Sequence, residues 1–175
     1  GGSAPYGFVI YRYDSNKAVN FEVFAPKIAR LDEILTARSL SNLADAPAAM
    51  TVAALDVTAP YPQESYSSEG PTNGPGGAAT GGFKKPDIAA FANVSTESYG
   101  TTNKFNGTSA ATPHVAGAAA LVLSARPYYT PAQLQTFLEG RAVDMGPAGK
   151  DNIYGHGRLR LGAPLPRPVD LPLIG

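Results

Sequence analysis

Apolar residues alternate with polar ones near the start of the chain and later give way to short, unbroken apolar runs. Residues 8–13 and 19–25 alternate on either side of a polar turn at 14–16, which predicts a β-hairpin. Residues 50–55 are apolar without alternation, as expected for a strand buried on both faces. Residues 86–91 form another short apolar segment.

A long glycine-rich loop separates these two runs and covers 66–82. The polar segment 94–105 predicts a loop or an edge hairpin. Residues 154–161 predict a further short strand or a turn.

Two helices are predicted between 105 and 141. The first spans about 108–125 and is apolar all round in its middle, so we expect it to be central and buried. The second has Thr130 as its N-cap, Pro131 in its first turn and Gln133 at the third position, which completes a capping box. Gly140 supplies its end. Its apolar stripe consists of Leu134, Phe137 and Leu138.

Charge and composition exclude several classes of protein. Lys and Arg total 14 and Asp and Glu total 14, which argues against a nucleic-acid binder. The chain has no cysteine, so a disulfide framework and a thiolate zinc site are ruled out. No apolar stretch is long enough for a membrane helix and no leader peptide is visible. We therefore expect neither a nucleic-acid partner nor a membrane partner. The Gly1-Gly2-Ser3 start and the Pro-rich end suggest a piece of a longer polypeptide.

One segment, 105–117, carries candidate chemistry. It places Ser109 in the first turn of the predicted buried helix, behind Gly107. The first amides of a helix lack internal partners and lie at the positive end of its dipole. Ser109 would therefore offer a hydroxyl nucleophile together with an amide donor for a forming oxyanion. On residue type alone, the alternative is that Thr108 or Ser109 merely caps the helix.

A wider pattern supports the first interpretation. Residues 107–121, GTSAATPHVAGAAAL, resemble the active-site serine motif of subtilisin-like serine proteases (subtilases, peptidase family S8), with Ala110 where Met is frequent. Further segments resemble the same family in the same order, namely 51–54, 64–72, 85–90, 130–140 and 154–159. Collinear matches are more specific than a single motif. The resemblance covers about 46–162.

The resemblance implies an α/β fold with the C-terminal half of a doubly wound, mostly parallel sheet. Residues 46–162 would form the C-terminal part of the catalytic domain. Residues 1–45, with the β-hairpin, look similar to the end of an inserted β-sandwich. Residues 163–175 would be a Pro-rich extended tail.

The resemblance also implies a function, a serine endopeptidase acting through an acyl-enzyme on Ser109. Thr108 would support the oxyanion site, and the substrate would be a peptide or protein. The family implies an extracellular or cell-surface location. We expect no cofactor and assign no metal ligand, because the acidic residues lack calcium-loop spacing, although calcium is frequent in the family.

The base that would activate Ser109 is missing from the chain. The family's catalytic order is Asp, His, Ser, yet both histidines, His114 and His156, follow the serine. His114 is five residues along the helix, about 500° of rotation and ~7.5 Å of rise, so it points away from Ser109. We expect His114 to be a buried, hydrogen-bonded structural group and His156 to lie at the surface.

The candidates before Ser109 for the catalytic Asp and the oxyanion Asn also lack the sequence context that the family implies. The aspartates Asp14, Asp32 and Asp45 are not in a D-[ST]-G motif, and a structural role is predicted for Asp87 in its "KPDI" segment. The asparagines Asn42, Asn93 and Asn106 do not match the segment that supplies the family's oxyanion amide. Since a lone Ser hydroxyl is a weak nucleophile, we predict that this chain alone is inactive and needs the missing N-terminal part of its catalytic domain.

Alternatives remain open. The protein could be a non-catalytic binding or structural module derived from a subtilase. An α/β-hydrolase is disfavoured, because Ala111 replaces the second Gly of the G-x-S-x-G elbow. The sequons at Asn93 and Asn106 are interpreted as chance. The apolar helix around Leu121 predicts marginal stability or aggregation of the isolated chain.

Overall fold

The computed structural model describes residues 11, 13, 14, 16, 35–41 and 43–163. The chain divides into two compact units, Gly1–Leu31 and Asp32–Gly175, and the elements below all belong to the second. The predicted hairpin over 8–25 and the tail from 164 onward lie outside the described residues, apart from the four isolated positions between 11 and 16.

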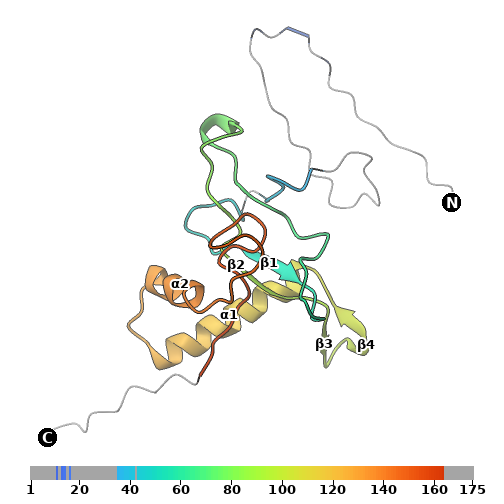
Figure 1. Cartoon of the computed structure of the whole chain (residues 1–175), viewed down its shortest axis with the longest axis vertical. Coiled ribbons are helices and arrows are strands. Elements are labelled where there is room, and N and C mark those ends of the chain that lie inside the picture. Colours follow the sequence, from blue (N-terminus) through green and yellow to red (C-terminus); the bar gives the residue numbers. More distant parts are fainter. Residues whose placement is uncertain (1–10, 12, 15, 17–34, 42, 164–175) are drawn as a thin grey trace, which may run out of the picture. The chain divides into compact units, whose positions relative to one another are not determined.

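The described part contains four strands, two α-helices and one 3₁₀ turn (Figure 1). In chain order they are β1 (Val52–Leu55), η1 (Pro75–Gly77), β2 (Ile88–Phe91), β3 (Val94–Thr96), β4 (Gly100–Phe105), α1 (Thr108–Ala125) and α2 (Pro131–Glu139). The two apolar runs are thus confirmed as strands. The polar segment between β2 and α1 takes the hairpin alternative, with β3 and β4 antiparallel.

Strands β1 and β2 pair in parallel, with Val52 opposite Ile88 and Leu55 opposite Phe91. Alternate side chains point to opposite faces. One face carries Ala54, Ile88, Ala90 and Ala92 and packs against the helices. The other face carries Ala53, Leu55 and Ala89 and packs against Phe91, Met145 and Tyr154. Both faces are therefore covered, as the continuous apolar runs predicted. The segment after Tyr154 is a turn with bridges from Arg158 to Ala89 and Val143.

Helix α1 lies across β1 and β2, and its bounds agree with the prediction. From Ala111 onward its buried side chains recur every three or four residues, as one stripe must. The buried residues are Ala110, Ala111, Val115, Ala118, Val122 and Ala125. Side chains outside this stripe are exposed, and among them Leu121 is 60% exposed and Leu123 is 37% exposed. The expectation of a helix buried all round is therefore wrong for the described residues. An apolar composition does not specify how many faces find a partner.

Helix α2 forms as its sequence predicts. The Gln133 amide donates to the Thr130 hydroxyl, and the Thr130 amide donates to the Gln133 side chain, which confirms the capping box. Leu138 is buried, and Leu134 and Phe137 pack against the same cluster as α1. Gly140 ends the helix in right-handed geometry, without the positive φ that glycine allows.

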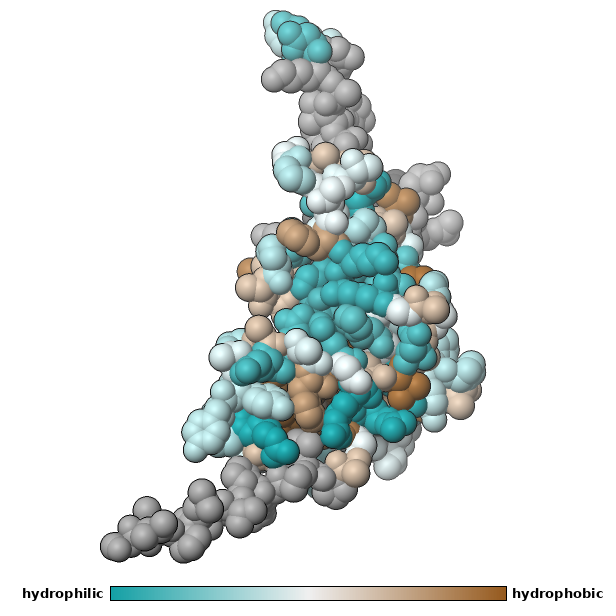
Figure 2. Space-filling view, turned by 60° about the vertical axis from the view of Figure 1, so that its left-hand side comes forward, coloured by the Kyte–Doolittle hydropathy of each residue, from teal (hydrophilic) through white to brown (hydrophobic). Residues whose placement is uncertain are grey.

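One face of the described part is largely hydrophilic. In the view of Figure 2, hydrophilic side chains form a continuous area over the middle of the described part, and hydrophobic side chains appear as separate spots around it. No helix among the described residues is long and apolar enough to cross a membrane.

Candidate active site

Ser109 lies in the first turn of α1 with an exposed side chain. The amides of Ala110 and Ala111 both donate to the carbonyl of Gly107. Within the described residues, no partner is found for either the hydroxyl or the amide of Ser109. An exposed hydroxyl and an unpaired amide at the positive end of an 18-residue helix form an arrangement that can present a nucleophile and stabilise an anion.

Gly107 gives the backbone its sharp entry into α1. It is the N-cap residue, with φ 84° and ψ 166°, and the helix is not capped by any side chain. Only glycine adopts this backbone region readily. A Cβ at this position would lie 3.9 Å from the Ser109 hydroxyl oxygen, so Gly107 and the Ser109 hydroxyl share one small space.

Pro113 leaves a gap in the helix directly above Ser109. Because proline has no amide hydrogen, the Ser109 carbonyl lacks the donor that residue 113 would otherwise supply. The first turn is therefore held less tightly than an unbroken helix would hold it.

Thr108, next to Ser109, lines a hollow in the surface. It shares this hollow of about 280 Å³ with Thr112, Ser68 and residues of the segment 40–52. This hollow adjoins the N-terminus of α1 through Thr108.

Neither histidine forms a hydrogen bond with Ser109. The His114 side chain is exposed, and its Nδ1–H donates to the Ala110 carbonyl at 2.8 Å. The prediction of a hydrogen-bonded His114 is thus confirmed, but the prediction of burial is wrong, because His114 lies outside the buried stripe of α1 and is exposed. His156 is partly exposed, and its Nε2 lies 3.5 Å from a Glu139 carboxylate oxygen.

Asp87 has the structural role predicted for it. It is buried, and its carboxylate accepts hydrogen bonds from Lys85, Lys150 and the Thr51 amide. Burial favours the protonated acid, but the bonds from Lys150 and Lys85 outweigh it and hold the pKa of Asp87 below its ordinary value. This cluster fixes the start of β2 and is not a site for chemistry.

A second acidic cluster lies where β1 and β2 end. The Asn93 side-chain amide donates to Asp56 at 3.2 Å and also to Glu64. Burial raises the pKa of Glu64, and the neighbouring Asp56 charge raises it further. The Asn93 side chain thus bridges the two carboxylates at the ends of the strands.

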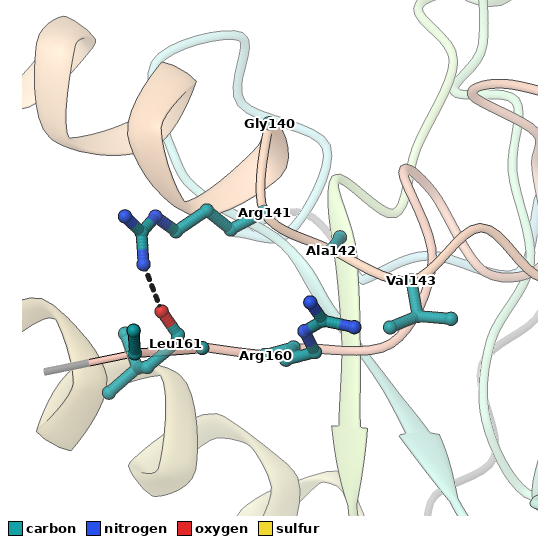
Figure 3. Close-up of a pocket in the computed structure, with 8 residues that line it drawn as sticks. Gly140, Arg141, Ala142, Val143, Arg160 and Leu161 are labelled. Carbon is teal, nitrogen blue, oxygen red and sulfur yellow. Dashed lines mark hydrogen bonds between the residues drawn. The ribbon is translucent and has the colours of Figure 1, made fainter.

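A larger hollow lies away from the serine. It measures about 520 Å³ and lies between the end of α2 and residues 160–163 (Figure 3). Arg141 donates to the Leu161 carbonyl across it and stacks on Phe137 at 4.7 Å. It contains no nucleophile, so it does not compete with Ser109 as a catalytic centre.

Metal ligands are not gathered in the described part of the chain. Among those residues, no three His, Cys, Asp or Glu side chains come close enough to hold an ion together. No step proposed below depends on a metal ion.

One contact at the serine could not be foreseen from the sequence. The Gly107 amide donates to the hydroxyl of Tyr66 at 3.0 Å. Tyr66 stands in the serine-rich loop 64–72, one of the segments that resemble the family, but nothing in the local pattern shows that this loop reaches α1.

Comparison with known proteins gives a consistent result. The family model "Subtilase family" (Peptidase_S8) matches residues 26–157. Over 64 residues the chain is 48% identical to subtilisin from Bacillus pumilus, covering 37% of this chain and 22% of that protein. Over 56 residues it is 43% identical to an "Extracellular serine protease" from Serratia marcescens, and the match covers 32% of this chain and 5% of that protein.

A solved structure shows the same relationship. Sphericase superposes with a TM-score of 0.50 at 29% identity, covering 63% of this chain and 39% of sphericase. The chain therefore matches only a minor part of each of these longer proteins.

Proposed function

The chain belongs to the subtilase family, and we propose that it carries the nucleophile of a serine endopeptidase, Ser109. The observation that supports this most is the Ser109 hydroxyl, exposed and unpartnered among the described residues, in the first turn of α1 behind Gly107. The matched family implies peptide or protein substrates.

The proposed reaction forms and then hydrolyses an acyl-enzyme. A base takes the hydroxyl proton of Ser109 while the oxygen attacks the scissile carbonyl carbon. The amide of Ser109 stabilises the negative charge on the carbonyl oxygen, and Thr108 beside it supports this oxyanion site. The same proton then goes to the leaving amine, and water releases the acyl group. The protein groups supply all of this chemistry, so we propose no cofactor.

The base must come from outside this chain. Both histidines of the chain follow Ser109, and each is held elsewhere, His114 by Ala110 and His156 by Glu139. We propose that the remaining part of the same catalytic domain supplies the Asp, the His and the second oxyanion donor. The 175-residue chain by itself is then inactive.

Labelling with a serine-directed phosphonate tests the proposal. In the complete gene product, we expect one phosphonate on Ser109, found by peptide mass mapping, and loss of label and of casein cleavage in Ser109→Ala. The matched control is Ser124→Ala, since Ser124 lies on the same helix and bonds only to the Leu121 carbonyl. We expect the 175-residue chain to remain unlabelled.

Two results would overturn the proposal. Labelling of the isolated chain at Ser109 would show that no external base is needed. An unlabelled complete protein would favour a non-catalytic module derived from a subtilase. We further propose an extracellular location, supported by the similarity to the extracellular protease of Serratia marcescens.

A further inference from the structure

The entry of the backbone into α1 is held from outside the helix. The Gly107 amide donates to the Tyr66 hydroxyl at 3.0 Å across 41 residues of sequence. Tyr66 belongs to the loop between β1 and η1. No side chain caps α1. The Tyr66 hydroxyl accepts the amide of the N-cap residue itself, the group that the third-position side chain of a capping box would otherwise hold.

The position of Gly107 decides what surrounds the Ser109 hydroxyl. A Cβ at 107 would lie 3.6 Å from the Ser109 amide and 3.9 Å from its hydroxyl oxygen. Rotation of the Gly107 peptide would therefore move atoms into or out of the space beside the hydroxyl. Glycine itself does not restrict this rotation, because it populates many backbone conformations.

Tyr66 is suited to limit that rotation. Tyr66 is 45% exposed, and its hydroxyl contacts the backbone two residues before Ser109. Partial burial, together with the charges of Glu64 and Asp56, raises the pKa of Tyr66. The phenol therefore stays neutral at ordinary pH. It can accept the Gly107 amide and still keep its own hydrogen.

We propose that Tyr66 is a positioning residue for Ser109, acting through the amide of Gly107. The inference rests on the proposed role of Ser109. The hydroxyl holds the peptide between Asn106 and Gly107, where the chain enters α1, so the first turn that carries Ser109 and its amide keeps one orientation toward a substrate carbonyl. Preorganised geometry of this kind matters because small misplacements slow a reaction.

The same bond has a chemical consequence at the preceding residue. Asn106 is exposed and precedes a glycine, the arrangement most prone to deamidation. In that reaction the Gly107 nitrogen attacks the Asn106 Cγ and loses its proton. The bond from Cγ to the side-chain nitrogen breaks, and ammonia leaves behind a cyclic imide. Water then opens the imide to aspartate or isoaspartate. A Gly107 amide held by Tyr66 is kept from this attack.

Tyr66→Phe removes the hydroxyl and keeps the ring. In the complete gene product, we expect it to slow phosphonate labelling of Ser109 about three- to tenfold, the effect of one neutral hydrogen bond. The loss is expected in kcat, with KM and the melting temperature nearly unchanged, because the hydroxyl orients the nucleophile. Tyr128→Phe is the matched control, since Tyr128 is 89% exposed.

Deamidation provides a readout that does not need activity. During storage of the complete protein at mildly alkaline pH, we expect Tyr66→Phe to convert Asn106 about three- to tenfold faster. Peptide mapping detects the gain of one mass unit. Asn73-Gly74 is the internal control, because the Gly74 amide is held by the Ala78 carbonyl instead, so its rate should not change.

Each outcome decides a separate point. Unchanged labelling, or unchanged deamidation at Asn106, in Tyr66→Phe would overturn the inference. If that variant fails to fold, hydrogen exchange of the Gly107 amide is measured in the wild-type protein instead. Exchange as fast as that of an amide without a hydrogen bond would also overturn the inference. If the wild-type protein is not labelled at Ser109, the proposed function fails, while the Asn106 comparison still decides whether Tyr66 holds Gly107.

Discussion

The ammonium of Lys85 lies 2.5 Å from the carboxylate of Asp87, and the two side chains are only 3% and 2% exposed. The same carboxylate accepts a bond from Lys150 at 2.7 Å and from the Thr51 amide at 2.8 Å. A buried charge without a partner is costly. This pair therefore stabilises the fold only as long as both members are present.

Replacing Asp87 should be among the most damaging single changes. Asp87→Asn leaves the Lys85 charge buried and unpaired, so we expect the free energy of unfolding to fall by about 3–5 kcal/mol. Urea titration followed by circular dichroism measures it. Asp45→Asn is the control, since Asp45 is exposed, and its effect should stay within about 0.5 kcal/mol. Equal effects of the two variants would contradict the assignment.

The same carboxylate predicts an acid dependence of stability. The pKa of Asp87 is lower in the folded chain than its ordinary value of 3.8, so the unfolded chain binds its proton more tightly. The stabilisation is complete above that ordinary value and is lost as pH falls through the lower, folded pKa. The stability difference between wild type and Asp87→Asn should accordingly shrink only in strong acid. A difference that disappears near neutral pH would disprove this.

The N-terminus of α2 offers a smaller, well-defined effect. Thr130→Ala removes the hydroxyl that accepts the Gln133 amide at 3.3 Å, and we expect a loss of about 1 kcal/mol in unfolding free energy. Thr136→Ala, an exposed position within the same helix, should change stability by less than about 0.5 kcal/mol. Chemical denaturation compares the two, and a larger loss in Thr136→Ala would refute the capping role.

The exposed apolar residues of α1 predict self-association of the 175-residue chain. Leu121 and Leu123 are exposed on the two flanks of its buried stripe, and exposed apolar surface promotes contacts between molecules. Leu121→Lys should lower the weight-average mass in sedimentation equilibrium. Tyr128→Lys, at a residue 89% exposed beyond the helix, serves as the control. A wild-type protein that sediments as a monomer at all concentrations would contradict this expectation.

Local sequence patterns predicted the elements well. The bounds of α1, the capping box of α2 and the two buried strands depend on residues close together in the sequence, where spacing and capping chemistry act directly. The position of Ser109 in the first turn of α1 was predictable for the same reason.

Contacts between distant residues were not predictable in this way. Lys150 reaches Asp87 across 63 residues, and Tyr66 reaches Gly107 across 41. The exposure of His114 depends on which surfaces are packed against α1, and its place on the helix does not specify that. These features depend on how separate segments meet, which single-segment patterns do not encode.

The parallel pairing of β1 with β2 has a consequence for how the two strands find their correct alignment. The paired sequences, VAAL and IAAF, are alike, so a shift of one residue would still place one alanine opposite another, although it would turn every side chain to the other face. Asp87 adds a second constraint on the register, because its carboxylate accepts the Thr51 amide while its own amide donates to the Thr51 carbonyl. These two hydrogen bonds between Thr51 and Asp87, at the start of the strand pair, therefore favour the observed register of β1 and β2.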